Sequence, residues 1–475
     1  MFIKIVFLFI IFLIKSVLNY IVIPFKTHHS INIKENDKDY NSTDFILNYY
    51  SNKIYFPIEV GFPQKEVAFI LITTTSGLNI GYSICTLFNF SDIPKKYLEY
   101  FPDNSSTYNL TSKNIKSISN TFMGSQSTEQ FKLYKNLDKK EYIIIEKLPF
   151  IYLSKNDVYE KYNDDIICGL IGLSLFERSS FKEDYHLINT LKKNKIIDNY
   201  IFTYEYSESN PEEGMLIIGE EPHNYNPQKY NKEQLIADYV VRDSIDLEWN
   251  IIFNSIYFFD ENNNKISITN NKYCKFIPEL NCIKGSSVYK KLIEEKFFNY
   301  YINKNICKYD FESLKLSNKN SYFYYAINCD INSEFKIEEF PSLYLWHKKY
   351  NYTFELNYND LFIKKGNKFF FMIIYPYSNI EYFELGKIFL KKYFFSYDID
   401  RKTISFYNKN IPINTKVENN ENNNKSFSIY LIIGGILFII TACVIGFFFG
   451  KKCYEKVRNK RKNELEEDYD YSLNQ

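Results

Sequence analysis

Short runs of β-branched and aromatic residues, separated by turn-forming residues, fill the chain from about residue 50 to residue 415. Branched and aromatic side chains pack well on a pleated sheet, whereas Asn, Asp, Gly, Ser and Pro favour the turns between strands. The clearest runs are IYFPIEVGF (54–62), VAFILITTT (67–75), EYIIIEKL (141–148), YIFTYEY (200–206), GMLIIG (214–219), FFFMIIYPY (369–377) and KTISFYN (402–408). The pattern predicts an all-β body.

One segment follows a helical period instead. HLINTLKKNKII (186–197) places apolar residues on one face and lysines on the other, which predicts an amphipathic surface helix. After residue 408 the chain becomes polar and ends in ENNENNNK, so we interpret residues 416–425 as an Asn-rich stalk.

The N-terminus carries a short apolar segment. Lys4 precedes ten apolar residues from Ile5 to Ile14, which is the layout of a signal peptide (1–19), with cleavage expected between Ser16 and Tyr20. The alternative is a retained anchor. It is less favoured, because ten helical residues rise only about 15 Å, half the thickness of a bilayer core.

Residues 426–450 carry no ionisable side chain except Tyr430 and Cys443. As a helix this segment would be about 37 Å long, enough to cross a bilayer with some tilt. The tail at 451–475 begins with a cluster of Lys and Arg residues, which the positive-inside rule places in the cytoplasm. The sequence therefore predicts a single-pass type I protein of the secretory pathway or cell-surface membrane, with a lumenal or extracellular body. The alternative is a buried core helix.

Length and charge narrow the possible functions. Roughly 400 residues remain between the two apolar ends, which suits two lobes of about 180 residues each. The formal net charge is +1, so nucleic acid is not an implied partner. The chain has five His and no CxxC motif, so we expect no metal site, and no cofactor is implied.

The cysteines and sequons fit an oxidising compartment. Six of the eight cysteines lie in the predicted body, where disulfides are permitted: Cys85, Cys168, Cys274, Cys282, Cys307 and Cys329. Sequence does not give their connectivity, and the local pairs Cys274–Cys282 and Cys307–Cys329 are our hypothesis. Glycosylation candidates that begin N-x-S/T sequons in the predicted body and its N-terminal extension are Asn41, Asn89, Asn104, Asn109 and Asn351.

Five segments occur in a recognisable order along this body. They are IEVGFPQ (58–64), ITTTSGLNI (72–80), ICGLIGL (167–173), GMLIIGEEPHNY (214–225), and FELGKIFLKKY (383–393) continuing through FSYD (395–398) to ISF (404–406). In this order they resemble the motifs I-x-I-G-T-P-x-Q, D-T-G-S-S-x-L-W-V, F-D-G-I-L-G-L, G-x-L-x-x-G-G-x-D-x-x-x-Y and W-I-L-G-D-x-F-L-R-x-Y-Y-x-x-F-D of the pepsin-like aspartic peptidases.

This resemblance covers the whole predicted body. It implies a bilobal acid-protease barrel with an N-terminal extension (20–49), an N-terminal lobe (50–232) and a C-terminal lobe (233–415). The spacing fits two similar halves: Ile72 precedes Gly172 by 100 residues, and Pro278, in KFIPELNCIKGSS (275–287), precedes Gly386 by 108.

The family's chemistry is missing from these motifs. An aspartic peptidase uses two carboxylates that share one proton and act on a bound water. The resemblance places Ile72 and Pro278 at the two aspartate positions. No Asp, Glu, His, Lys or Arg occurs from residue 67 to residue 91, and Glu279 is the only acid near the second position. The loop glycines are replaced by Thr74 and Leu280.

Two further positions depart from the family. Lys387 stands where the family has Asp after Leu-Gly. The flap-like segment 118–127 keeps Gly124 and Ser125 but has Thr121 or Phe122 where the family usually has Tyr.

We therefore interpret the chain as a catalytically inactive, membrane-anchored, pepsin-fold protein whose interlobe cleft binds a peptide or protein segment. The first alternative is an active aspartic-type endopeptidase with non-standard catalytic groups, Glu279 among them. The second is a sorting or adhesion receptor, since Tyr454-Glu455-Lys456-Val457 matches a Y-x-x-hydrophobic sorting signal.

Overall fold

The computed structural model of the chain describes residues 19–28, 53–72, 83–87, 102–116, 123–135, 140–153, 167–173, 175, 187–210, 212–241, 248–317, 320–412, 454, 456 and 458. The chain divides into two compact units, Met1–Ile411 and Pro412–Gln475. The predicted stalk, the span 426–450 and all of the signal peptide except Asn19 lie outside the described residues. None of the described helices is long and apolar enough to cross a membrane.

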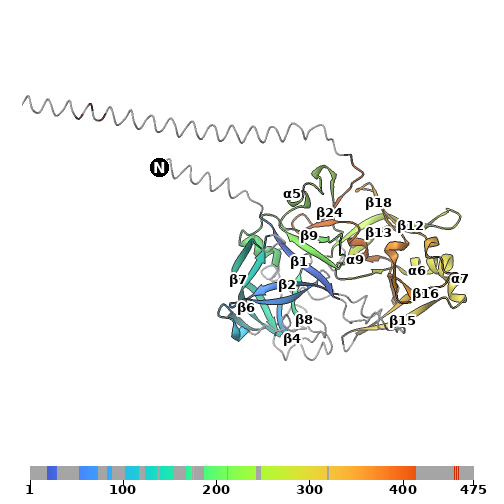
Figure 1. Cartoon of the computed structure of the whole chain (residues 1–475), viewed down its shortest axis with the longest axis horizontal. Coiled ribbons are helices and arrows are strands. Elements are labelled where there is room, and N and C mark those ends of the chain that lie inside the picture. Colours follow the sequence, from blue (N-terminus) through green and yellow to red (C-terminus); the bar gives the residue numbers. More distant parts are fainter. Residues whose placement is uncertain are drawn as a thin grey trace, which may run out of the picture. The chain divides into compact units, whose positions relative to one another are not determined.

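The first unit contains two β-sheets, of which the first has 13 strands (Figure 1). Two additional pairings, β1–β6 and β2–β6, close part of this sheet into a barrel. The strand order is β11 (Leu235–Tyr239), β24 (Thr403–Tyr407), β23 (Phe395–Asp398), β9 (Ile201–Tyr206), β10 (Glu213–Ile218), β1 (Ile21–His28), β2 (Lys53–Val60), β3 (Lys65–Ile72), β8 (Ile167–Gly172), β4 (Ser83–Leu87), β7 (Tyr142–Leu153), β6 (Met123–Tyr134) and β5 (Asn109–Lys116).

The second sheet has 11 strands. Their order is β18 (Tyr352–Leu356), β17 (Leu343–His347), β12 (Asn250–Phe259), β13 (Lys265–Phe276), β22 (Phe383–Leu385), β14 (Ile283–Lys284), β21 (Ile373–Pro376), β16 (Asn320–Asp330), β20 (Lys368–Phe371) and β19 (Phe362–Lys365), with β15 (Cys307–Ser317) paired to β16.

Short helices connect these strands. The α-helices are α4 (Leu187–Lys193), α5 (Pro222–Tyr225), α6 (Ser287–Ile293), α7 (Asn299–Asn303), α8 (Tyr358–Leu361) and α9 (Lys387–Leu390). The π-helix η5 (Glu294–Phe298) joins α6 to α7, and the 3-10 helices are η2 (Pro102–Asn104), η4 (Lys232–Gln234) and η6 (Ile337–Glu339). The all-β prediction is thus confirmed for the part of the chain that the structure describes.

The two sheets repeat one strand arrangement. In the first sheet β2, β3, β8, β4, β7 and β6 follow one another, and in the second β12, β13, β22, β14, β21 and β16 do the same. In each set the second and third strands are parallel, β3 with β8 and β13 with β22. In each set the third and fourth strands are antiparallel, and the fourth and fifth are parallel. This repetition is what the sequence spacing of the two halves predicts.

The strands of the first sheet come from both ends of the described body. Residues 21–28, inside the predicted N-terminal extension, form β1, which pairs with β10 from Ile21↔Ile218 onward. β23, inside the predicted C-terminal lobe, pairs with β9 through Ser396↔Thr203. The boundaries at residues 50 and 233 therefore do not separate the two sheets. Strand β23 is buried along its whole length and pairs with β24 on one side and with β9 on the other.

Most sequence-predicted elements match the observed ones within a few residues. The predicted helix 186–197 is shorter, since α4 ends at Lys193 and Lys195 takes a left-handed φ of 57° that closes the turn. The run FFFMIIYPY divides at Met372, because residues before it pair with β19 and residues after it pair with β14 and β16.

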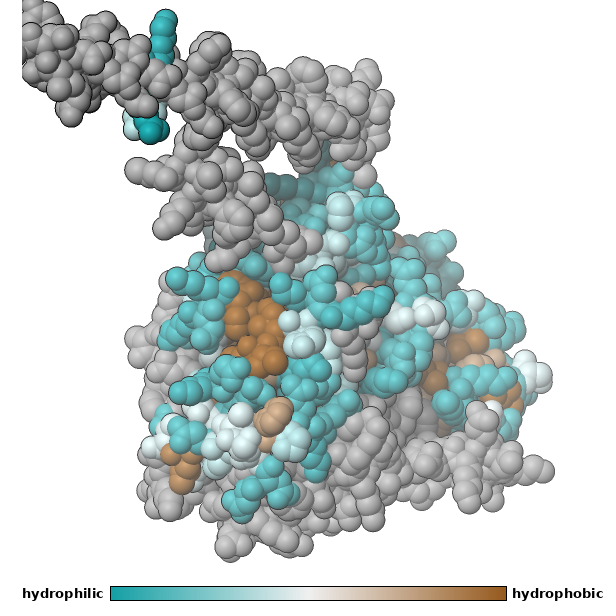
Figure 2. Space-filling view, turned by 60° about the vertical axis from the view of Figure 1, so that its left-hand side comes forward, coloured by the Kyte–Doolittle hydropathy of each residue, from teal (hydrophilic) through white to brown (hydrophobic). Residues whose placement is uncertain are grey.

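Aromatic side chains fill the core where the two halves meet. The ring of Phe202 stacks on that of Tyr397 at 4.9 Å and contacts Trp249 edge-on at 5.5 Å. The Trp249 indole Nε1–H donates to the Leu173 carbonyl at 2.8 Å, so a residue beside β12 is tied to the end of β8. The described surface on the side of the first sheet is hydrophilic over most of its area, with a few apolar patches (Figure 2).

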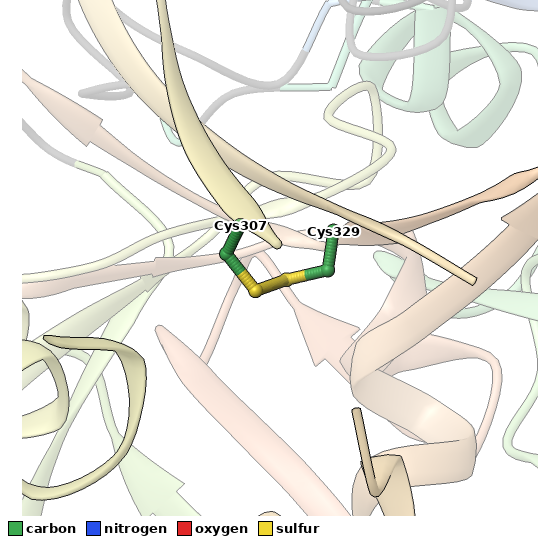
Figure 3. Close-up of a disulfide and its surroundings, with 2 residues drawn as sticks. All are labelled: Cys307 and Cys329. Atoms are coloured by element: carbon green, nitrogen blue, oxygen red, sulfur yellow. A yellow bond between two sulfur atoms is a disulfide. The ribbon is translucent and has the colours of Figure 1, made fainter. Parts of the chain in front are cut away.

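One of the two proposed disulfides is present. Cys307 and Cys329 face each other across β15 and β16 and are bonded (Figure 3). Cys274 and Cys282 are buried free thiols, so the second proposed pair is wrong. Cys274 lies on β13 and Cys282 precedes β14, and β22 lies between these strands. Strands two positions apart are separated by about 9.6 Å, beyond the Cα–Cα distance of about 4.4–6.8 Å in disulfides.

Candidate functional site

The first loop position that the sequence singles out lies at the end of β3. The register of β3 and β8 runs from Phe69↔Gly169 to Ile72↔Gly172. Ile72 is thus the last paired residue of its strand and lies beside Gly172 of the ICGLIGL segment. Residues 73–82, which follow, lie outside the described residues.

The second loop is a tight turn at the end of β13. The Leu280 N–H donates to the Ile277 carbonyl at 3.0 Å, with Pro278 and Glu279 at the two central positions. Proline suits the first central position of such a turn because its fixed φ matches the geometry. The Ile277 N–H donates to the Leu385 carbonyl at 3.0 Å, and the Lys387 N–H donates to the Leu280 carbonyl at 2.7 Å. The turn is therefore held against β22 and α9.

Gly386 lets β22 approach this turn closely. A Cβ atom at residue 386 would lie 2.1 Å from the Leu280 carbonyl oxygen and 2.2 Å from the Cys282 carbonyl oxygen. Only glycine fits between these two backbone groups.

The pairing of β13 with β22 does not match Pro278 to Ile72, as the motif comparison did, but matches the residue before Pro278. The register of β13 and β22 ends at Phe276↔Leu385, so the next residue, Ile277, corresponds to Gly386. In the same way Ile72 lies opposite Gly172. Pro278 therefore lies one residue beyond the position that matches Ile72. Neither Ile277 nor Ile72 carries an ionisable group.

Glu279 lies close to a cluster of buried tyrosines. Tyr204 and Tyr206 are two residues apart on β9 and so point to the same side of the sheet, and the Tyr397 ring on β23 lies 6.0 Å from that of Tyr204. Burial raises the pKa of all three phenols, and the negative charge of Glu279 raises each further. Among the described residues none of the three hydroxyls has a hydrogen-bond partner.

Lys387 forms an ion pair between the two sheets. Its Nζ lies 2.8 Å from an Oε atom of Glu212, in the turn that joins β9 to β10. The Lys387 side chain is 7% exposed and that of Glu212 is 33% exposed. Burial lowers the pKa of Lys387, whereas the charge of Glu212 acts in the opposite direction. We call Ile72, the turn 277–280, the Lys387–Glu212 pair and Tyr204, Tyr206 and Tyr397 the central site.

The flap-like segment belongs to a β-hairpin. β5 and β6 are antiparallel, with Ile115↔Gly124 and Lys116↔Met123 as the last pairs before the hairpin tip. Gly124 and Ser125 lie in β6, opposite Leu153 and Tyr152 of β7. Thr121 and Phe122 lie outside the described residues, so their part in a flap stays a prediction.

The described groups of the central site do not resemble a proton-sharing carboxylate pair. The charge of Glu279 acts on three phenols, and Glu212, the other acid near Tyr206, pairs with Lys387. Within the described ranges no three His, Cys, Asp or Glu side chains cluster as metal ligands would. The described groups can accept or donate hydrogen bonds.

A comparison with protein-family models shows which family the chain belongs to. The family model described as "Eukaryotic aspartyl protease" matches residues 53–409. The chain belongs to this family. The match covers both sheets almost completely, from the first residue of β2 to just beyond β24.

Comparison with solved structures gives the fold of this family member. It is similar to basic 7S globulin from soybean (14% identity, TM-score 0.53, 82% of this chain and 95% of that one). It is equally similar to conglutin gamma, a basic 7S globulin from lupine seeds, at 12% identity and with the same TM-score and coverage. At these identities the likeness shows a pepsin-like bilobal fold and nothing more. A search of curated proteins found no match.

Sequence reasoning found the turn and Lys387 but not the groups around them. The Y-x-Y spacing of Tyr204 and Tyr206 carried a usable signal, since residues two apart on a strand share a face. Nothing in the sequence marks Glu212 as the partner of Lys387, because 175 residues separate them.

Three of the candidate sequons lie in described segments. Asn104 ends η2, Asn109 begins β5, and Asn351 lies in the turn between β17 and β18 with a φ of 47°. All three residues are exposed, as an acceptor for a glycan must be. Asn41 and Asn89 lie outside the described residues, and glycosylation stays a prediction at all five positions.

Proposed function

We propose that this member of the eukaryotic aspartyl protease family is a membrane-anchored, non-catalytic protein whose cleft between the two lobes binds a peptide or protein segment. The observation that carries the proposal is the lack of any acid between residues 67 and 91, where β3 ends at Ile72 opposite Gly172. No shift of register within that segment supplies the first carboxylate.

The second half supports the same proposal. Peptide hydrolysis by this family requires two carboxyl groups close enough to share a proton, one as base and one as acid. The charge of Glu279 acts on the phenols of Tyr204 and Tyr206, and the charge of Glu212 is paired with Lys387. Glu279 has no acidic counterpart between residues 67 and 91, and one carboxyl group does not supply both roles.

A pepsin-like fold without its acids keeps the means to bind an extended chain. The β5–β6 hairpin carries part of the predicted flap segment, and an extended peptide can pair with strand edges through its main chain while pockets select alternate side chains. The membrane span at 426–450 and the basic flank after it support an orientation with this body on the lumenal or extracellular side.

A cleavage assay tests the proposal. Purified full-length protein is incubated with a mixed peptide library between pH 3 and pH 7, and products are detected by mass spectrometry. We expect no cleavage above a no-protein control, and we expect a subset of the peptides to stay bound to the protein. Cleavage by the wild type that disappears in Glu279→Gln would overturn the proposal in favour of an endopeptidase with non-standard catalytic groups.

A further inference from the structure

A surface pocket of about 680 Å³ lies at one end of the second sheet. The end of β12 with the turn after it, the η5–α7 helices, the segment around η6 and the start of β17 form its walls. None of its lining residues belongs to the central site. In Figure 1 α7 lies at the far right, away from β9 and α9. Its volume is in the range of pockets that hold ligands, roughly 300–1,000 Å³.

Aromatic rings in this pocket face solvent. Phe259 is 38% exposed and Tyr300 is 58% exposed. The Phe259 ring lies 5.6 Å from that of Tyr344, and the Tyr300 ring lies 5.1 Å from that of Tyr301. Neighbouring exposed aromatic rings are typical of binding surfaces, where they supply large rigid contact areas.

Negative charge predominates on the pocket wall. Its lining contains the acids Asp260, Glu261, Glu334 and Glu339 and the lysines Lys296 and Lys336. Lys336 pairs with Glu339 at 2.9 Å, and Lys296 lies 3.3 Å from Glu295. Glu261 is exposed and forms no ion pair with the described residues.

The acidic wall is preformed. The Asp260 carboxylate accepts hydrogen bonds from the backbone N–H groups of Asn262 at 3.0 Å and Asn264 at 2.8 Å. These bonds lower the pKa of Asp260, with that of Asn264 the strongest cause, so the group stays ionised. Asn263 takes a left-handed φ of 59°, which fixes the turn that carries Glu261.

The rings around the pocket already bind lysine ammonium groups. Lys304 Nζ lies 4.7 Å from the centre of the Tyr300 ring and 2.6 Å from Glu334. Lys265 Nζ lies 3.8 Å from the centre of the Tyr257 ring, which stacks on Tyr344 at 5.3 Å. A cation between a ring face and a carboxylate is thus the arrangement that this surface uses within the chain.

We propose that this pocket is a second binding site, separate from the lobe cleft, for a basic peptide segment of a partner protein. An arginine or lysine side chain of the partner lies against Tyr300 and Phe259 and pairs with Glu261. The aromatic faces bind its aliphatic stem, and the excess of carboxylates selects its charge.

Fluorescence anisotropy with the full-length protein tests this site. The probes are a labelled glycine-flanked tri-arginine peptide and the same peptide with citrulline, which has the shape of arginine without its charge. We expect the arginine peptide to bind at least about tenfold more tightly, with an affinity that falls as salt is raised from 50 to 300 mM. Equal binding of the two peptides would overturn the proposal.

Matched variants locate the binding. Glu261→Gln and Tyr300→Ala change exposed side chains and are each expected to weaken arginine-peptide binding about fivefold. Glu338→Gln and Tyr239→Ala are the controls, because both residues are exposed and neither lines the pocket. Unchanged affinity in both pocket variants, with all four variants folded by circular dichroism, would exclude this pocket as the site.

Discussion

At the scale of single residues, Glu221 and Asp398 bring two buried carboxyl groups close together beside β23. The two residues are 8% and 5% exposed. Burial raises the pKa of Glu221 to about 7, and the charges of Asp398 and Glu220 add to the rise. A hydrogen bond with Ser396 and the charge of Arg401 oppose it. Burial also raises the pKa of Asp398, against the opposing effect of Arg401.

This pair predicts a pH dependence of stability. The pKa of Glu221 is about 7 in the folded chain and 4.5 for an ordinary Glu, so the folded state binds more protons between these values. The contribution of Glu221 to stability is therefore most favourable below pH 4.5 and falls as the pH rises toward 7. Glu221→Gln removes the titrating group, and we expect it to stabilise the chain at pH 7 by about 2 kcal/mol.

Urea unfolding of wild type and variant at pH 4.5, 5.5 and 7 measures the effect. The control is Glu220→Gln, since that neighbouring carboxylate is only partly buried. A stability difference between wild type and Glu221→Gln that stays constant over this range would show that Glu221 does not titrate there.

A second residue-scale prediction concerns Gly386. Its φ of −96° is open to any residue, so a substitution acts only through the carbonyl oxygens about 2 Å from the new methyl group. Gly386→Ala must displace either the turn 277–280 or β22, and we expect a loss of more than about 2 kcal/mol. Thermal and urea unfolding measure it. A loss below half that value would mean that the turn moves aside at little cost.

At the scale of elements, the hairpin of β15 and β16 depends on its disulfide. Cys307 and Cys329 are 22 residues apart in the sequence, and for a loop of this length cross-linking stabilises a chain by about 3 kcal/mol. Cys307→Ser/Cys329→Ser should lose about this amount relative to the oxidised wild type. Added reductant should bring the wild type down to the same stability.

Cys274→Ala is the matched control for this pair. Burial raises the pKa of the Cys274 thiol, and its Sγ takes part in no disulfide, so its variant should respond to reductant as the wild type does. Peptide mapping that joined Cys274 to Cys282 would contradict the structure.

Sequence periodicity was a good guide to the elements and a poorer guide to their partners. The runs that predict β2, β3, β9, β10 and β24 carry their own signal in β-branched and aromatic residues. The pairing of β1 with β10 or of β23 with β9 joins residues far apart in the chain, and single-strand patterns contain no information about it. The disulfide error has the same origin, because the insertion of β22 between β13 and β14 is a long-range event.

The central site also contains residues that local sequence patterns could place and residues that they could not. Ile72 and Lys387 could be placed from ordered motifs, because each lies next to a glycine of its own half, whereas Pro278 lies one residue beyond the position that matches Ile72. Tyr397 could not be placed beside Glu279 from the sequence, since the contact requires the first sheet to take strands from the end of the body.

At the scale of the whole described body, the two repeated strand sets are joined by shared structure rather than by a linker alone. β23 and β24 of the chain's second half extend the first sheet, and the Trp249 indole reaches the end of β8. The Lys387–Glu212 ion pair adds a polar contact between α9, beside the second sheet, and a turn of the first.

A double-mutant cycle on this pair tests whether it couples the two halves. The variants are Lys387→Met, Glu212→Gln and their combination. Lys387 is almost fully buried. Removal of one partner leaves the charge of the other without its counter-charge, whereas the double variant leaves neither charge. We expect a coupling energy of about 1 kcal/mol or more by urea unfolding.

The neighbouring ion pair Lys26–Glu213 is the control for this cycle. Its atoms lie 2.9 Å apart, but its side chains are 56% and 45% exposed, so solvent screening should keep its coupling within a few tenths of a kcal/mol. Additive losses in the Lys387–Glu212 cycle would show that the lysine in the place of the family's aspartate does not hold the halves together. Coupling well above that of the control would mean that the lysine at this position stabilises the contact between the two halves.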